Sequence, residues 1–303
     1  MKKITLAALL LATAGIASAQ VEISGKIGMY MDRTEKGGAQ TTGVVQEGTN
    51  NITFKAKEDL GGGLSARVIV DTKLTTADPT SANTQLGDRE STVGLASAFG
   101  SVDMGRSYSS SFNVIRTTDP FGNMYASIAP DIHPDHGKRF SNGVFLKATP
   151  IAGAQVSYDR VQSTTAGAVE GLSYGLNYSI ANVQLKAARF EQGLEKSNIF
   201  GAVATLSTTR LSVIHSDDTS STGVLTHGTS VGVAQPITGT KVTMLGSYGK
   251  KTGNSSTDAT AYNVGMNYDF SKRTSGQLMY RKVDANVASL DTRQVGVGLI
   301  HRF

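Results

Sequence analysis

Two histidines near the middle of the chain have a spacing at which side chains can share a metal ion. His133 and His136 are three residues apart, with Asp131 and Asp135 beside them. A helix would have to align these side chains as ligands, and Pro134 interrupts any such helix. No second cluster of ligands is visible in the sequence, so we predict no metal site here.

Other reactive residue types lack the spacing that catalysis needs. Serine, histidine and aspartate are all present, but no Gly-x-Ser-x-Gly elbow exposes a serine nucleophile. Gly249-Lys250-Lys251-Thr252 does not have the spacing of a phosphate-binding loop. The chain has no cysteine, which excludes disulfides and thiolate metal sites. We therefore predict neither an enzyme nor a bound cofactor.

The first 19 residues are predicted to be a cleaved signal peptide. Lys2 and Lys3 precede an apolar run at 4–16, and Ala17-Ser18-Ala19 is a small-residue cleavage site. The run is shorter than the ~18 residues that a membrane-spanning helix needs. The mature chain, residues 20–303, then has 27 basic and 24 acidic residues. This small and dispersed excess of positive charge does not indicate nucleic-acid binding.

Apolar and polar residues alternate with a period of two along the whole mature chain, for example at 21–32 and at 294–303. Helices would require spacings of three and four. Short turns alternate with longer polar stretches such as 34–48 and 192–196, a pattern typical of an outer-membrane hairpin ladder. We count sixteen strands, at about 21–33, 49–59, 63–75, 88–97, 100–107, 139–148, 154–161, 171–180, 183–191, 197–206, 210–217, 225–234, 240–248, 258–268, 274–282 and 292–303.

The predicted fold is an all-β, antiparallel transmembrane β-barrel. The polar face of the strands carries charges that do not fill a dry interior, including Lys26, Lys55, Arg67, Lys147 and Arg281. In a barrel the apolar face contacts lipid, and closure pairs the strand edges. Sixteen strands enclose more space than side chains fill, so we expect an aqueous channel. Aromatic residues near strand ends are expected to form interfacial girdles: Tyr30, Phe99, Tyr108, Phe190, Tyr268 and Phe270.

The connection at 107–138 is the longest in the chain and has no clear strand. Loops longer than ~15 residues are usually functional or disordered. This one carries many apolar residues, such as Phe112, Phe121 and Tyr125, and is therefore unlike a disordered segment. We expect it to fold inward and pack on the barrel wall. A large outward loop is the alternative.

Seven short segments resemble those of a known family and occur in the family's order. They are VEISGK at 21–26, KEDLGGGL at 57–64, VGL at 93–95, FGSVDMGR at 99–106, DPFG at 119–122, RFSNGV at 139–144 and YDFSKRT at 268–274. Each segment alone is weak. Together they resemble the general trimeric porins of Gram-negative outer membranes, of the β-proteobacterial type, over essentially the whole mature chain.

The resemblance implies a homotrimer of sixteen-stranded barrels, each with its third loop folded into the pore. It also implies a constriction in which basic wall residues face acidic loop residues. By position, Lys26, Arg89 and Arg139 match the basic wall positions, and Asp119 falls beside the acidic segment of the loop.

This chain departs from the family pattern in the loop. Where relatives often carry acids around the Phe-Gly pair, it has Arg116, Pro120 and Asn123. Because charged rings tune ion selectivity, we predict a mild preference for anions. The residues expected at the constriction are Lys26, Arg67, Arg89, Arg106, Arg116, Asp119, Asp131 and Arg139. The alternation leaves the side of Arg106 open, and Arg67 is equally compatible with a role in a hairpin.

The predicted function is passive diffusion of small hydrophilic solutes and ions through an outer-membrane channel. A substrate-specific channel and a barrel that acts mainly as an adhesin or anchor are the alternatives. The expected partners are two further copies of the chain, outer-membrane lipid and lipopolysaccharide, and the outer-membrane assembly machinery. That machinery is expected to read the terminal Phe303 as a signal.

Overall fold

A computed structural model describes residues 20–77, 85–133, 139–161 and 169–303. The signal peptide predicted at 1–19 lies outside these residues. The described strands are β1 (Gln20–Lys36), β2 (Ala39–Gln46), β3 (Asn51–Gly61), β4 (Leu64–Lys73), β5 (Glu90–Ser97), β6 (Gly100–Tyr108), β7 (Arg139–Ala148), β8 (Ala154–Val161), β9 (Gly171–Ile180), β10 (Val183–Gln192), β11 (Glu195–Leu206), β12 (Thr209–Thr219), β13 (Leu225–Pro236), β14 (Val242–Thr252), β15 (Ala259–Asp269), β16 (Thr274–Ala285) and β17 (Thr292–Arg302). The described helices are α2 (Ser110–Thr118), α3 (Ala129–Ile132) and the 3-10 helix η2 (Ala288–Leu290).

The strands form one antiparallel sheet that closes on itself. From β3 onward each strand pairs with the next, and β17 pairs with β1 from Lys26↔Arg302 to Lys36↔Thr292. Both β2 and β3 pair with β1, so they are two parts of one interrupted strand of the barrel. The barrel therefore has sixteen strand positions, and the predicted fold class is confirmed. Closure joins the two ends of the sheet, as a lipid environment requires.

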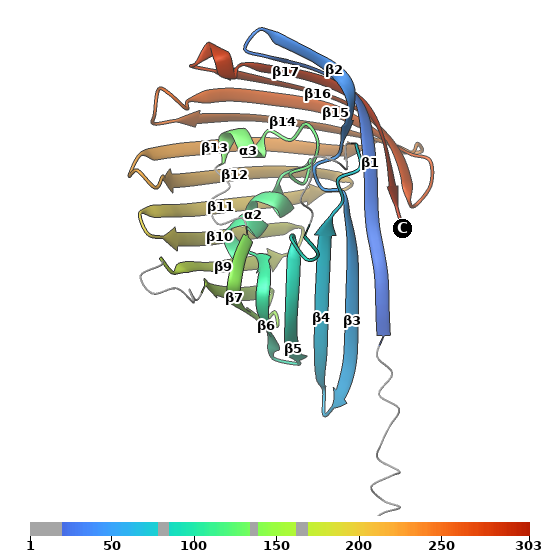
Figure 1. Cartoon of the computed structure of the whole chain (residues 1–303), viewed down its shortest axis with the longest axis vertical. Coiled ribbons are helices and arrows are strands. Elements are labelled where there is room, and N and C mark those ends of the chain that lie inside the picture. The colour runs from blue at the N-terminus through green and yellow to red at the C-terminus, as the bar shows by residue number, and fades with distance from the viewer. Residues whose placement is uncertain (1–19, 78–84, 134–138, 162–168) are drawn as a thin grey trace, which may run out of the picture.

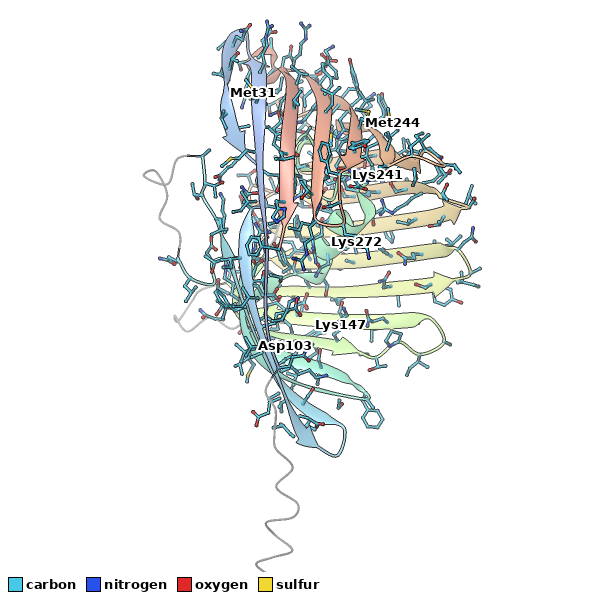
Figure 2. The ribbon with its side chains drawn as sticks, turned by 90° about the vertical axis from the view of Figure 1, so that its right-hand side faces the viewer. Met31, Asp103, Lys147, Lys241, Met244 and Lys272 are labelled. Atoms are coloured by element: carbon cyan, nitrogen blue, oxygen red, sulfur yellow. The ribbon has the colours of Figure 1, made fainter. Side chains whose placement is uncertain are left out.

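The outer face of the barrel is apolar and exposed. Met31 of β1 is 72% exposed and Met244 of β14 is 43% exposed, and Figure 2 labels both among the side chains of the upper strands. Other exposed apolar residues occupy alternate positions of the remaining strands, including Val93, Leu95, Met104, Val156, Leu176, Phe200, Val213, Val231, Val264, Leu278 and Val297. An apolar surface of this extent is favourable against lipid and unfavourable against water.

The long third connection folds back onto the inner face of the sheet. Helix α2 contacts β8–β12 and α3 contacts β13–β15, and Figure 1 shows both helices enclosed by the curve of the sheet. Three apolar clusters hold this segment. They contain Phe121, Tyr125 and Ala126 with Tyr30, Met279 and Ile300; Val114, Ile115 and Ala129 with Ala188, Ile199 and Ile214; and Ile128 and Ile132 with Ala259, Ala261 and Val283. Each large side chain buried in this way stabilises the docked loop by roughly 1.5–3 kcal/mol.

Glycines on the inner face let the loop lie close to the wall. A Cβ atom at Gly232 of β13 would lie 2.6 Å from Pro120 Cγ, and one at Gly296 of β17 would overlap the Tyr125 hydroxyl. Any larger residue at these positions would push the loop away from the strands. The glycines of the polar face thus provide space for the loop itself.

Two loop-end connections are shorter than the sequence predicted. Instead of a polar loop at 34–48, β1 continues to Lys36, turns at Gly37-Gly38 and returns as β2. The extension is stable because β1 has a ladder partner on each side there, β2 and β17. Likewise 192–196 contains only a two-residue turn between β10 and β11.

Three of the six aromatic residues expected in the girdles face inward. Tyr30 and Phe190 are almost completely buried, and Tyr108 lines an internal cavity. They occupy inward positions of the alternation, where the loop or other aromatic rings cover them. The other three are exposed near the short turns: Phe99, Tyr268 and Phe270. In the described part of the chain, no helix is long and apolar enough to cross a membrane.

Candidate functional site

Charged residues of the barrel wall dock helix α2 at both of its ends. At the N-terminus, the Ser110 N–H donates to the carboxylate of Asp159 on β8 at 2.5 Å. At the C-terminus, Lys186 Nζ donates to the Thr117 carbonyl at 3.2 Å, and Arg210 Nη2 donates to the same carbonyl at 2.8 Å. A helix carries partial positive charge at its N-terminus and partial negative charge at its C-terminus. Each contact therefore complements the helix dipole and satisfies a free backbone group.

Helix α3 fixes the second half of the loop. Asp131, a predicted constriction residue, forms an ion pair with Arg281 of β16 and so tethers the loop to the wall. His133 is completely buried, with Nδ1 2.9 Å from Ser216 Oγ and Nε2 2.8 Å from Ser230 Oγ. Burial lowers the pKa of His133 to about 3, so its ring is neutral at pH 7.

His133 therefore has a structural role on the inner wall. Its predicted companion, His136, lies outside the described residues. Among the residues that the structure describes, no group of three or more histidine, cysteine, aspartate or glutamate side chains is arranged to hold a metal ion.

Asp119 shapes the turn after α2. Its carboxylate accepts hydrogen bonds from the Phe121 N–H at 3.2 Å, the Asn123 N–H at 2.8 Å and the Ser127 hydroxyl at 2.7 Å. Burial raises the pKa of Asp119, whereas these hydrogen bonds favour the charged form. The structure thus differs from the expectation that Asp119 faces the lumen, because the turn uses its carboxylate oxygens.

A buried cluster around Tyr125 holds the tip of the loop. The Tyr125 ring stacks on Tyr30 with centroids 3.7 Å apart, and its hydroxyl donates to Asp32. Gln294 of β17 donates to the same carboxylate oxygen at 2.9 Å. The Tyr125 N–H donates to the carboxylate of Glu47 at 3.1 Å. The loop tip is thereby joined to β1, to β17 and to the break between β2 and β3.

A cavity of about 950 Å³, here called the main cavity, lies between the loop and the wall. Among the described residues that line it, seven are basic and one, Asp88, is acidic. The basic residues are Lys26, Lys73, Arg89, Arg116, Arg139, Arg281 and Arg302. A second cavity of about 340 Å³ beside α2 has a nearly balanced lining of Arg67, Arg116, Lys147 and Lys186 with Glu90, Asp103 and Asp159. The excess of positive charge is therefore concentrated in the main cavity.

Three arginines converge on Tyr108 at the side of the main cavity. The Tyr108 hydroxyl accepts hydrogen bonds from Arg89 Nη2 at 2.8 Å and from Arg139 Nη2 at 2.7 Å. The guanidinium carbons of Arg139 and Arg116 lie 4.4 Å and 4.9 Å from the ring centroid. The negative face of the ring offsets part of the repulsion among these cations. Arg89 also pairs with Asp71 at 3.1 Å.

Arg67, another predicted constriction residue, lies in the second cavity. It forms an ion pair with Asp103 and donates to Ser101 Oγ at 2.8 Å, both on β6. Its charge is thus matched across the intervening strand β5, and Arg67 is not among the described residues that line the main cavity.

Arg106 lies on the outer face, which corrects its predicted place in the constriction. The ladder between β5 and β6 is regular from Val93↔Met104 to Ser91↔Arg106, so Arg106 shares the face of the exposed Met104. Its Nε donates to the Asp88 carbonyl at 2.7 Å near the loop end of the strand. The alternation alone was ambiguous here because β6 pairs irregularly with β7 next to this residue.

Several residues that hold the loop or line the main cavity were not predicted as site residues. Arg281 has the polar-face position that alternation indicates, but nothing in the sequence pairs it with Asp131. Glu47 falls in a stretch that reads as a loop. Others are single charges, among them Lys73, Asp88, Asp159, Lys186, Arg210 and Arg302.

Comparison with known proteins identifies the family. Residues 5–288 match the family model described as Gram-negative porin. The chain belongs to this family. As a porin it is an outer-membrane channel, so the predicted class and location are confirmed. No curated protein sequence matches the chain.

Solved structures share the fold of this porin. An anion-selective porin from Comamonas acidovorans has a TM-score of 0.81 and 20% identity, covering 94% of this chain and 100% of that chain. OmpF of Salmonella typhi, in a complex with daunomycin, has a TM-score of 0.73 and 16% identity, covering 93% and 97%. The trimer form of OmpT from Vibrio cholerae has a TM-score of 0.73 and 12% identity, covering 94% and 100%.

Proposed function

We propose that this porin conducts small hydrophilic solutes and ions by passive diffusion, with a mild preference for anions. The observation that carries the proposal is the lining of the main cavity, where the described residues include seven cations and one carboxylate. An ion that crosses a wet passage with such a lining experiences a positive potential, which raises the local concentration of anions. The similar fold of the anion-selective porin from Comamonas acidovorans supports this proposal.

The preference is expected to be mild because part of this charge is matched. Lys26 pairs with Glu47, Arg89 with Asp71 and Arg281 with Asp131. The four cations of the cavity that form no ion pair with a described carboxylate are Lys73, Arg116, Arg139 and Arg302. These four supply most of the field that a permeating ion meets.

The test is the reversal potential of the reconstituted porin in a planar bilayer across a KCl gradient. We expect stable, non-saturating conductance and a reversal potential of the sign set by chloride. A reversal potential of the sign set by potassium would overturn the anion preference. Negligible conductance would instead contradict open conduction and favour a barrel that acts as an adhesin or anchor.

A substrate-specific channel is the second candidate. The convergence of Arg89, Arg116 and Arg139 on one side of the cavity favours it, because a fixed cluster of donors can retain one class of solute. Such a channel would show saturable transport and a current that its solute blocks at low concentration. Current that rises linearly with salt, with no block by organic acids, would favour the general channel.

The assembly of the porin is proposed to follow the same family pattern. We infer a homotrimer, supported by the trimer form of OmpT from Vibrio cholerae, which shares the fold. Outer-membrane lipid and lipopolysaccharide would cover the apolar outer face. Residues 1–19 would direct export and be removed, and the assembly machinery would recognise Phe303. Chemical crosslinking of the native membrane, followed by mass measurement of the unheated species, distinguishes a trimer from a monomer.

A further inference from the structure

The second strand of the barrel is broken next to the main cavity. The ladder with β1 ends at Lys26↔Asn51 in β3 and resumes at Met29↔Gln46 in β2. Two residues of β1 thus face four residues of the other strand, so the broken strand has two extra residues. An insertion of this kind bends a strand and interrupts its ladder. Glu47 follows β2 on the inward face of its alternation, opposite Gly28, and its side chain has no exposed surface.

The broken segment is held in a defined shape by Asn50. Its side-chain oxygen accepts from the Gly28 N–H at 2.7 Å, and its Nδ2 donates to the Gly28 carbonyl at 3.0 Å. The Glu47 N–H donates to the same carbonyl at 2.8 Å. Both backbone polar groups of Gly28 therefore keep a hydrogen-bond partner, although the ladder is interrupted at this residue. A Cβ atom at Gly28 would lie 2.9 Å from Glu47 Cβ, so the buried glutamate also needs a glycine opposite it.

The carboxylate of Glu47 connects the wall to the loop. One oxygen accepts from the Tyr125 N–H at 3.1 Å. The other is 2.8 Å from Lys26 Nζ and accepts from the Thr49 N–H at 2.8 Å and from the Thr49 hydroxyl. Both carboxylate oxygens of Glu47 thus have partners, and one of these partners is the ammonium group of Lys26.

The position of this carboxylate has two separate consequences for permeation. It neutralises Lys26, one of the seven described cations that line the main cavity, and so weakens the positive field there. It also binds the backbone of the loop tip, and the neighbouring Met124 lies with Sδ 3.4 Å from Lys26 Nζ. Loss of the carboxylate would therefore change the charge of the cavity and release the loop.

We propose that Glu47 is a selectivity-determining and loop-positioning residue of this porin, and that the two extra residues between β2 and β3 serve to hold its carboxylate. This inference rests on the proposed ion conduction. It adds that the anion preference is limited by a buried carboxylate that does not itself line the cavity. Loop position and ion preference are coupled through one side chain.

The test compares Glu47→Gln with the double variant Lys26→Met/Glu47→Gln in planar bilayers. Glutamine preserves the size and one acceptor, but leaves Lys26 unmatched. We expect the anion-to-cation permeability ratio to rise about twofold at low salt, as one added unit charge beside a wet path predicts. The double variant removes both charges, so its ratio is expected to return to the wild-type value. A ratio for Glu47→Gln equal to wild type, or a double variant that stays shifted, would overturn the charge role.

The positioning role has its own readout. Glu47→Ala, which lacks any acceptor for the Tyr125 N–H, is expected to increase open-channel current noise more than Glu47→Gln does. Glu90→Gln is the matched control, because Glu90 lines the second cavity and bonds Ser107 on the wall. Equal noise in all three variants would overturn the positioning role. If Glu47→Ala does not assemble, the noise of Glu47→Gln against Glu90→Gln decides the same question.

Failure of this inference is distinguishable from failure of the proposed function. The sign of the wild-type reversal potential tests the anion preference of the channel. The shift between wild type and Glu47→Gln tests Glu47 whichever sign the wild type has. Suppose the wild type is cation-selective and the Glu47→Gln variant has a higher anion-to-cation permeability ratio. The proposed anion preference would then be rejected, and the role of Glu47 would be retained.

Discussion

Arg139 lies face-on against Tyr108 and is bonded to it as well. Its guanidinium carbon is 4.4 Å from the ring centroid, and its Nη2 donates to the Tyr108 hydroxyl at 2.7 Å. Tyr108 comes from β6 and Arg139 from β7, on either side of the long loop. The last residue of β6 and the first residue of β7, which flank the long loop, are thus in contact on the wall. A cation fixed in this way acts as a preorganised charge rather than as a mobile side chain.

Replacement of Arg139 by glutamine is expected to reduce the anion preference. The variant removes one of the four cavity cations that form no ion pair with a described residue, and glutamine can still bond Tyr108. The anion-to-cation permeability ratio from reversal potentials is expected to fall about twofold at low salt, with a smaller change at 1 M, where screening is strong.

Arg106→Gln is the matched control for this measurement. It removes the same charge from the outer face, where the ladder with β5 places it. Its permeability ratio is expected to equal that of wild type. A fall in the ratio as large as that of Arg139→Gln would show that Arg106 acts on the permeating ion, contrary to the structure.

The docking of α2 predicts a second effect. Asp159→Asn removes the negative charge at the N-terminus of the helix, and Arg210→Met removes a cation at its C-terminus. Each change is expected to weaken loop docking by about 0.5–2 kcal/mol, the range for charges that complement helix ends. Limited proteolysis of the folded porin should then cut the loop faster, while the barrel stays intact on gels. Cleavage at the wild-type rate in both variants would contradict the docking role.

Much of this barrel was predictable from sequence because its wall obeys a local rule. Alternation with a period of two gives the inward and outward faces of each strand, and hairpin turns give the strand order. Lys26, Arg89 and Arg139, which were predicted at the constriction, line the main cavity, and their role in permeation stays a prediction. Closure and the sixteen strand positions follow from the same pattern.

The constriction was less predictable, because it depends on an irregular turn and on contacts between distant segments. Asp119 has the position expected of a loop acid, but the turn that follows α2 uses its carboxylate. Tyr30 has the sequence position of a girdle residue, but in the structure its ring is stacked under that of Tyr125. Glu47 depends on a break of two extra residues in a strand, which the composition of the segment does not reveal. In each case a side chain takes its role from a partner nearly 80 or more residues away or from an irregular backbone, which alternation does not report.

The buried His133 predicts a dependence of loop docking on pH. Its pKa is lowered from 6.5 to about 3 by burial, so the folded state favours the neutral ring. Its contribution to stability is therefore complete above pH 6.5 and is lost progressively as the pH falls toward 3. Because one pKa unit corresponds to about 1.4 kcal/mol, protonation of His133 at pH 4 is expected to weaken loop docking by a few kcal/mol.

The measurement is the rate of loop proteolysis by an acid-tolerant protease between pH 7 and pH 4. We expect the rate for wild type to rise as the pH falls. For His133→Gln, which keeps polar contacts to Ser216 and Ser230, the rate should depend less on pH. His301→Gln, altered on the outer face, is the control and should follow wild type. Identical pH profiles for wild type and His133→Gln would reject this role.

Recognition of Phe303 by the assembly machinery can be distinguished from a contribution of Phe303 to barrel folding. Phe303 exchanges two backbone hydrogen bonds with Gly25, of 3.0 and 3.1 Å, at the seam where β17 meets β1. Its ring covers Gly25 so closely that a Cβ atom there would overlap it.

Phe303→Ala keeps the backbone bonds but removes the aromatic ring, whereas Gly25→Ala displaces the ring without changing the C-terminal sequence. If the assembly machinery reads the ring, Phe303→Ala should lower the yield of trimer in cells several-fold and still refold in detergent, and Gly25→Ala should assemble far better in cells. Leu299→Ala, which shortens an exposed apolar side chain of β17, controls for loss of outer-face area. If Phe303→Ala and Gly25→Ala instead fail to refold in detergent to the same extent, the ring acts as part of the barrel seam, and the recognition role is rejected.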